Sequence, residues 1–310
     1  MSAIDTHTWI PEEWDSSVIM RVNQVSVVES QARRVPMAHN IIHEPRSSGA
    51  SVAAVAKSAA YAEDASANDV VTLTAVKMGE VFRIPLEEIN DNIVDVIETK
   101  RKDWATSYAK FLDNACLGTS AAANGGTIPF LSLYQALRTT DSNVSYTADN
   151  NYTSATNATL ASSAGYAKLD AVLKLVETSD YWDDGNMLVI AHPSFRSTLR
   201  LQVDANGRPI FVQGTAGTPD TLFGIPIRWS LGAVATTTAT ATPASTTHRL
   251  LFVGNPDYLY LGVRSGPESA TATADAGAAF LTDETLLKMR SRRGFACANE
   301  NAWAVLENTG

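Results

Sequence analysis

The chain has 310 residues, of which 45% are apolar and 18% charged, and its formal net charge is -9 at pH 7. This composition is typical of a folded protein and excludes a disordered one. The acidic balance, with short basic clusters only at 33–34, 100–102 and 290–293, argues against sequence-specific DNA recognition. Two isolated cysteines, Cys116 and Cys297, form no disulfide framework and predict a reducing, cytosolic setting.

The sequence predicts no membrane segment. The N-terminus lacks the basic start and apolar run of a signal peptide. No apolar stretch approaches the roughly 20 residues needed to cross a bilayer. We therefore expect a soluble protein that is made in a cytoplasm.

Residues 1–45 predict an extended arm, because apolar and polar residues mix there without sustained periodicity. Pro11 stands where a short helix can begin, and residues 22–28 are compatible with a short strand or helix. Pro36 and Pro45 interrupt the segment that follows. The arm is therefore expected to find its apolar contacts elsewhere.

Residues 51–61 and 69–84 predict the two strands of a long hairpin, joined by the polar segment 62–68. Apolar and polar residues partly alternate in the second strand. A two-stranded ribbon is only marginally stable alone in water. We therefore expect it to lie on a partner surface, either in its own chain or in the next subunit.

A helix of about 32 residues is predicted between Pro85 and Gly118, and at 1.5 Å per residue it would be roughly 48 Å long. Two acidic residues occupy its first turn, and Glu98 and Lys102 are spaced for an ion pair. Apolar residues recur at steps of three and four along it: Leu86, Ile89, Ile93, Ile97, Trp104, Tyr108, Phe111, Leu112 and Cys116. Such a long helix directly after a long hairpin is uncommon.

The middle of the chain predicts an α/β unit, and its C-terminal part predicts further strands. The expected helices are 130–137, 166–176 and 192–201, and the expected strands are 187–191, 224–227, 250–253, 258–263, 271–274 and 285–290. Residues 233–247 are nearly all alanine and threonine, which predicts an exposed loop.

No catalytic or metal-binding pattern is convincing. His39 and His43 are four residues apart, but prolines bracket them and no third ligand is evident. No phosphate-binding loop or Gly-x-Ser-x-Gly motif is present. Asp183 and Asp184 are adjacent and point in different directions, and Cys116 lies on an apolar stripe. We expect no enzyme, cofactor or metal site.

The order of these elements resembles that of the major capsid proteins of tailed bacteriophages, which have the Hong Kong 97-type fold. Five segments carry the resemblance in the family's order: 9–14 in the arm, 84–91 at the start of the spine helix, 223–227 and 251–262 in and after the central lobe, and 283–306 in the terminal strands. Each match is short, but together they span essentially the whole chain.

The resemblance implies an α+β fold with five regions. These are an N-terminal arm (1–45), an extended-loop (E-loop) hairpin (46–83), a peripheral domain with the spine helix (84–126), an axial domain (127–256) and the C-terminal strands of the peripheral domain (257–310). It also implies a non-enzymatic virion protein, assembled in the bacterial host cytoplasm, whose pentamers and hexamers form an icosahedral shell.

The implied partners are other copies of the chain, a portal, possible decoration proteins and packaged double-stranded DNA, which is contacted without sequence specificity. Because the arm begins almost at Met1, the scaffold is expected to be a separate protein or to have been removed already. Some family members join subunits by a lysine–asparagine isopeptide bond. The resemblance makes Lys57 and either Asn299 or Asn301 the candidates, with Glu300 as a possible base.

Two alternatives remain open at this point. An encapsulin shell has the same fold and encloses a cargo enzyme, so co-purified cargo would distinguish it from a capsid. A cytosolic α/β enzyme with residues 127–256 as its active lobe would need a polar cleft with perturbed titratable groups. The missing nucleophile motif argues against the enzyme.

Overall fold

A computed structural model describes residues 25–47, 52–61, 68–91, 95–204, 206–214, 218–243, 246–272 and 282–310, with residues 20, 22, 49 and 63. The chain divides into two compact units. The larger comprises residues 24–78, 107–268 and 290–310, and the smaller comprises 1–23, 79–106 and 269–289. The expected helix at Pro11 lies outside the described residues.

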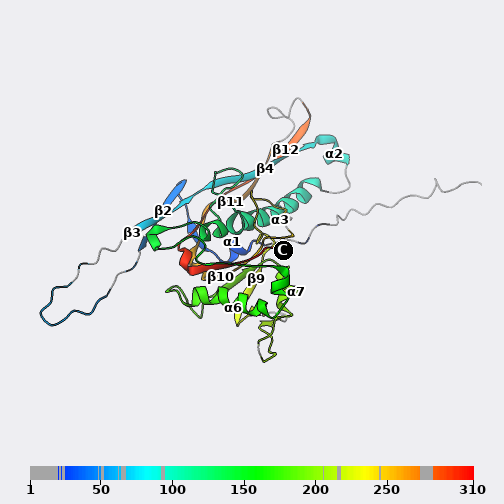
Figure 1. The fold of residues 1–310 in the computed structure, drawn as a ribbon. Coiled ribbons are helices and arrows are strands. Elements are labelled where there is room, and N and C mark those ends of the chain that lie inside the picture. The colour runs from blue at the N-terminus through cyan, green and yellow to red at the C-terminus, as the bar shows by residue number, and fades with distance from the viewer. Residues whose placement is uncertain are drawn as a thin grey trace, which may run out of the picture. The chain divides into compact units, whose positions relative to one another are not determined.

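A seven-stranded mixed sheet forms the centre of the larger unit (Figure 1). Its order is β5 (Tyr152–Ala155), β13 (Trp303–Asn308), β10 (Arg249–Gly254), β6 (Leu188–Ala191), β9 (Ile225–Trp229), β8 (Thr221–Leu222) and β7 (Phe211–Val212). Strand β10 is antiparallel to both β6 and β13, whereas β5 is parallel to β13 and β9 is parallel to β6.

Helix α6 (Ala164–Glu177) packs against β5, β10 and β13. Its apolar residues follow helical spacing, and Leu169, Val172, Leu173 and Val176 are all buried, which confirms this predicted helix. Each such side chain contributes roughly 2 kcal/mol through burial. The other short helices of this part are α4 (Leu133–Leu137), α5 (Asn157–Leu160), α7 (Phe195–Leu199), η2 (Ser142–Val144), η3 (Pro256–Tyr258) and η5 (Glu300–Ala302).

The closing strand β13 is a central strand of this sheet. The sequence placed residues 303–308 with the peripheral strands, but they pair with β10, which it placed in the axial region. All six residues of β13 are buried. A strand buried on both faces has a continuous apolar run, such as Trp303–Leu306, and no alternation that would indicate its partner.

A second sheet has the order β1, β11, β12, β4. Its strands are β1 (Arg33–Pro36), β11 (Leu259–Ala272), β12 (Glu284–Cys297) and β4 (Val76–Pro85). Strand β1 runs parallel to β11, with Arg33 opposite Tyr260. The strands predicted at 258–263 and 285–290 are confirmed as parts of β11 and β12, which are much longer. Residues 271–272 of the predicted strand 271–274 also belong to β11, and residues 273–274 lie outside the described residues.

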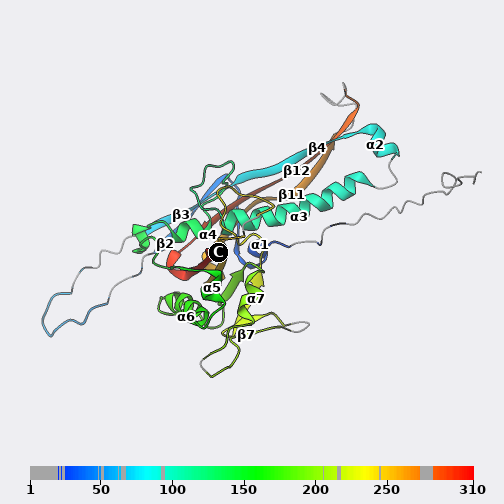
Figure 2. The ribbon, with the colours of Figure 1, turned by 45° about the vertical axis from the view of Figure 1, so that its right-hand side comes forward.

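The hairpin ribbon consists of β2 (Ile41–Ser47) and β3 (Asn68–Thr74), which lie side by side in both views (Figure 2). The prediction of a strand at 51–61 was wrong, because residues 52–61 form no strand and are exposed. The true partner of β3 lies mostly in the segment assigned to the arm, where periodicity is weak and Pro36 and Pro45 interrupt the chain. A proline is compatible with an edge strand, and β2 is one.

The predicted long helix is two helices, α2 (Leu86–Asp91) and α3 (Val96–Leu117). Pro85 ends β4 and is not helical. Asp95 begins α3 by accepting a hydrogen bond from the backbone N–H of Glu98 over 3.0 Å, which makes it an N-cap. The predicted pair of Glu98 with Lys102 is present at 3.9 Å, and Gly118 directly follows α3 as expected.

A buried carboxylate links α1 (Val27–Gln31) to α3. Asp113 accepts hydrogen bonds from the hydroxyls of Ser26 and Ser230 over 2.5 and 2.6 Å. It also accepts from the backbone N–H groups of Val27 and Val28. Burial raises the pKa of Asp113, and these four donors oppose the rise.

The Ala/Thr-rich segment 233–247 is only partly an exposed loop. Ala233 and Val234 are completely buried, and the side-chain amide of Asn114 donates to the carbonyl of Val234 over 3.0 Å. Thr236 forms an isolated bridge with Thr119. The sequence prediction failed here because small residues close to a helix can pack into it as readily as they can form a surface loop.

A candidate anchoring site for the hairpin ribbon

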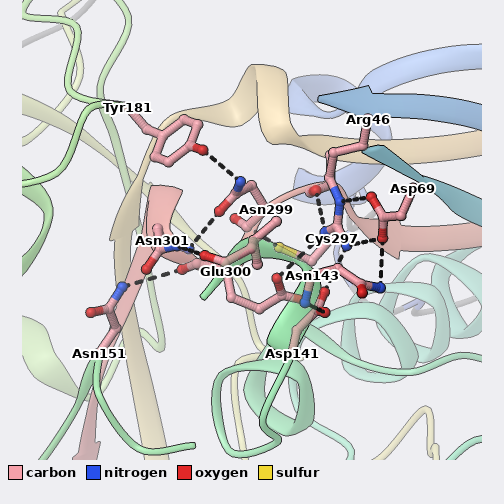
Figure 3. Close-up of polar contacts among 12 residues, drawn as sticks. Arg46, Asp69, Asp141, Asn143, Asn151, Tyr181, Cys297, Asn299, Glu300 and Asn301 are labelled. Carbon is pink, nitrogen blue, oxygen red and sulfur yellow. Dashed lines mark hydrogen bonds and ion pairs between the residues drawn. The ribbon is translucent and has the colours of Figure 1, made fainter. Parts of the chain in front are cut away.

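Arg46 and Asp69 are cross-strand neighbours near the Ser47–Asn68 end of the ribbon (Figure 3). The guanidinium donates from Nε to Asp69 Oδ1 over 2.8 Å and from Nη2 to Oδ2 over 2.6 Å. This two-pronged pair fixes both the direction and the distance of the charges. It lowers the pKa of Asp69 and raises that of Arg46.

The same guanidinium reaches two other segments. Its Nη2 donates to Asp141 Oδ2 over 2.7 Å, and its Nη1 donates to the carbonyl of Ala298 over 2.9 Å. The Arg46 side chain is only 12% exposed. The Ser47–Asn68 end of the ribbon is therefore joined to the turn at η2 and to the residue after β12 through one planar group.

Asn143 adds a second connection between the ribbon and η2. Its side-chain amide donates to Asp69 Oδ2 over 2.9 Å. Its backbone N–H donates to Asp141 Oδ1 over 3.0 Å, so that Asp141 caps η2 with one oxygen and binds Arg46 with the other. The two aspartates therefore have a polar partner for each oxygen.

Glu300 is the third carboxylate beside Arg46, and it is less well bonded. It is only 7% exposed, and its Oε2 lies 3.7 Å from Arg46 Nη1, which is too long for a hydrogen bond. That oxygen has no hydrogen-bond partner in the described part of the chain. Burial, with a smaller contribution from the charge of Asp141, raises the pKa of Glu300 to about 7, although the charge of Arg46 opposes the rise.

The structure places Asn299, Glu300 and Asn301 in one turn before β13. Asn299 is 3% exposed, its Oδ1 accepts from the backbone N–H of Asn301 over 3.0 Å, and its Nδ2 donates to the hydroxyl of Tyr181 over 2.8 Å. Lys57 lies on an exposed turn, and none of the described contacts joins it to these residues.

Sequence reasoning found Glu300 but missed Arg46, Asp69 and Asp141. These three are 23 and 72 residues apart along the chain (46 to 69, and 69 to 141). The signal that could have found the first pair is the antiparallel register of β2 and β3, in which Arg46 stands opposite Asp69. No local motif indicates Asp141.

A cavity of about 380 Å³ lies beside this cluster and is lined by Val71, Phe130 and Phe295 as well as by Arg46 and Glu300. Cys297 also lines it, but burial raises the pKa of that thiol well above its usual range, so it is a poor nucleophile. Of the two histidines four residues apart, His43 has its Nδ1 3.0 Å from Thr72 Oγ1 across the ribbon. The described side chains contain no group of three His, Cys, Asp or Glu residues arranged to hold a metal ion.

No helix within the described ranges has the length and apolarity to cross a bilayer. The hydrogen bonds of Arg46 to Asp69, Asp141 and the carbonyl of Ala298 anchor and orient the ribbon. It lacks the paired nucleophile and base that covalent catalysis requires.

A model of the phage capsid family matches residues 7–308 of this chain. Among solved structures, the chain is similar to a Mycobacterium phage Ogopogo protein, with 17% identity, a TM-score of 0.73 and coverage of 99% of this chain and 100% of that one. It is also similar to the capsid of a native GTA particle, with 14% identity, a TM-score of 0.70 and coverage of 99% and 97%.

A Microbacterium phage Oxtober96 protein has 15% identity, a TM-score of 0.69 and coverage of 98% of both chains. At such low identity these likenesses show the fold, which is the Hong Kong 97-type capsid fold. The predicted fold class is thereby confirmed. No curated protein sequence matches the chain.

Replacing Arg46 tests the anchoring site. We expect Arg46→Ala to lower the free energy of unfolding by about 3 kcal/mol, because it leaves the buried Glu300 and the partly buried Asp69 and Asp141 without their shared cation. Arg46→Lys should lower the free energy of unfolding by a smaller amount, because lysine keeps the positive charge but not the two-pronged geometry. The measurement is urea unfolding of the purified subunit followed by tryptophan fluorescence.

Arg208→Ala is the matched control, because Arg208 is exposed and its side chain makes no ion pair with a described residue. It should change the free energy of unfolding by less than about 0.5 kcal/mol. Equal effects of the Arg46 and Arg208 changes would contradict an anchoring role.

Glu300 should make stability depend on pH. A carboxyl group whose pKa is raised to about 7 on folding holds a proton that the unfolded chain releases near pH 4.5, so its contribution to stability falls as the pH rises through this range. We expect Glu300→Gln to remove this pH dependence. The free energy of unfolding of the variant should therefore rise relative to that of the unchanged chain by up to about 3 kcal/mol as the pH is raised from 5 to 8.

The measurement is the free energy of unfolding of both proteins at several pH values. Glu177→Gln, an exposed position at the end of α6, is the control and should follow the unchanged chain. A Glu300→Gln curve parallel to that of the unchanged chain would contradict the assignment.

Proposed function

The chain belongs to the phage capsid family, and from this we propose that its copies assemble into the pentamers and hexamers of an icosahedral shell around double-stranded phage DNA. Its role is structural: it is the major capsid protein of a tailed phage, located in the virion. The observation that carries the proposal is the family match, which spans residues 7–308.

The exposed loop of the ribbon supports assembly on physical grounds. Val52 is 98% exposed and Tyr61 is 85% exposed, and the described residues 52–61 contain no strand or helix. Large apolar side chains on an extended segment are a liability in an isolated subunit. Contact with other copies would cover them, as is usual where a subunit is incomplete alone.

The proposed role extends to partners and to the five-region division. We assign residues 1–40 to the arm and 41–83 to the extended loop, because β2 pairs with β3. We assign residues 127–256 to the axial domain together with β13, which pairs with β10, and the regions 84–126 and 257–302 to the peripheral domain. A separate scaffolding protein, a portal and decoration proteins complete the proposed particle. Such a shell needs no catalytic group, cofactor or metal.

Assembly is tested directly by expressing the chain alone and with the phage's scaffolding protein. We expect closed shells, or rings of five and six subunits, by size-exclusion chromatography and negative-stain electron microscopy. Only monomers or dimers at every salt and protein concentration would contradict the proposal. Shells that contain a cargo enzyme would instead indicate an encapsulin.

A covalent role for Lys57, Asn299 and Glu300 stays a prediction. Bond formation would join the lysine amine to the asparagine side-chain carbonyl and release ammonia, with Glu300 accepting a proton. The buried contact of Asn299 with Tyr181 would first have to open. On a denaturing gel of boiled particles, a cross-linked shell gives multiples of 33.2 kDa that disappear in Lys57→Arg, whereas a single band at 33.2 kDa contradicts the bond.

A further inference from the structure

A hollow of about 210 Å³ lies beside strand β2 and is lined by three tyrosines, Tyr181, Tyr258 and Tyr260. The remaining lining residues belong to the larger unit as well: residues 44–47, Val71, Ala298 and Asn299. Its volume is below the roughly 300–1,000 Å³ of pockets for drug-sized ligands. This tyrosine hollow therefore suits a small headgroup and not a large cofactor.

The rings of Tyr181 and Tyr258 form two walls of the tyrosine hollow at nearly a right angle. Their centroids are 5.1 Å apart and their planes are inclined by 81°. Both rings are half-buried, so part of each stays open to solvent. The face of an aromatic ring carries partial negative charge, and perpendicular rings that share a corner attract a cation to that corner.

Tyr260 shows that the chain already uses one ring of the hollow in this way. The guanidinium carbon of Arg33 lies 5.2 Å from the centre of the Tyr260 ring, and Nη1 donates to the tyrosine hydroxyl over 3.4 Å. In the described part of the chain no cation lies over the ring of Tyr181 or Tyr258. These two rings are therefore available to a cation from outside the chain.

The charged side chains around the hollow also favour a cation. Glu44 lines it, is half-buried and makes no ion pair or side-chain hydrogen bond with a described residue. The other charged lining residue is Arg46, whose positive charge is already paired with Asp69 and Asp141. Three carboxylates thus stand against one guanidinium, and the net local charge is negative.

The hydrogen bonds of the phenol groups indicate which kind of cation fits. The hydroxyl of Tyr181 accepts from Asn299 Nδ2 over 2.8 Å, and that of Tyr260 accepts from Arg33 (Figure 3). The rings therefore offer their faces more than free acceptors. An ammonium group with three N–H donors would lose hydration without regaining its hydrogen bonds, whereas a fully methylated nitrogen has no N–H donor to satisfy.

We propose that Tyr181, Tyr258 and Glu44 form a binding site for a small quaternary ammonium cation of the choline type. The two ring faces contact the methyl groups, and the carboxylate of Glu44 supplies the opposite charge. Because a few partly exposed cation–π contacts hold the ligand, we expect a dissociation constant of roughly 1 mM. This site is additional to the shell-forming role and does not depend on it.

Saturation-transfer difference NMR of the choline methyl protons, with the purified full-length protein, tests the site. We expect Tyr258→Leu to weaken binding by about tenfold, because a ring face is lost. Glu44→Gln should weaken it by about threefold through loss of the unpaired charge. Tyr181→Phe removes the hydroxyl and keeps the face, so its dissociation constant should stay within about twofold of that of the unchanged chain.

Tyr61→Leu is the matched control, because Tyr61 is exposed and lies outside the hollow, and it should leave binding unaltered. Circular dichroism checks that each variant folds. Equally tight binding of 3,3-dimethyl-1-butanol, the uncharged carbon analogue of choline, would overturn the proposal, and so would tighter binding of ethylammonium. Unchanged binding in both Tyr258→Leu and Glu44→Gln would also overturn it.

The source of the cation is distinguished with phosphatidylcholine vesicles. Co-sedimentation of the protein with them, lost in Tyr258→Leu, would support the site with a lipid headgroup as its ligand. Binding of choline without co-sedimentation would support it with a free solute as its ligand. Absence of choline binding refutes the site alone, because shell formation is measured separately by electron microscopy.

Discussion

The guanidinium of Arg46 is the interaction on which the placement of the hairpin ribbon depends. A two-stranded ribbon is only marginally stable alone, and although Val71 and Leu73 on one face of this ribbon are buried, its other side chains are exposed or half-buried. Arg46 compensates by binding across the ribbon to Asp69 and outward to Asp141 and the carbonyl of Ala298. A planar group with donors in fixed directions is suited to this, whereas an apolar contact of the same size would leave the ribbon free to swing.

The anchoring site has one drawback, which is its excess of carboxylates. Each carboxylate oxygen of Asp69 and Asp141 accepts a hydrogen bond, and both aspartates pair with Arg46. The positive charge of Arg46 is therefore largely neutralised without Glu300. Glu300 is buried beside Arg46 but is too far from it for a hydrogen bond, and burial of this poorly compensated carboxylate raises its pKa. Replacing a buried charged network by apolar residues is often stabilising. Its presence at this joint therefore supports a role in orientation more than in overall stability.

Sequence reasoning succeeded where the residues of one helix or strand alone indicate its structure. Helix α6 has its apolar stripe, and Gly118 marks the end of α3, so both are local signals. Sequence reasoning failed where a single residue decides the structure. Pro45 lies inside strand β2, which was not predicted, and Asp95 caps a second helix where one long helix was predicted. It failed most completely for the anchoring site, because the contact of Arg46 with Asp141 depends on how distant segments fold together. A local pattern contains no information about that contact.

The described charges therefore fall into two groups that serve different stages of shell building. Asp113, Arg293 and Arg46 are buried with partners from distant segments, so they are satisfied as soon as the subunit folds. Arg264 and Arg292 line a hollow on the face of β11 and β12 without an ion pair to another described residue, and Val52 and Tyr61 of the loop are exposed. Internal pairs fix the direction in which the ribbon leaves the subunit, and unsatisfied charges on a sheet face cost little while they are hydrated. Contacts between copies that cover Val52 and Tyr61 would bury apolar surface that the single subunit leaves exposed, which favours assembly over the isolated chain.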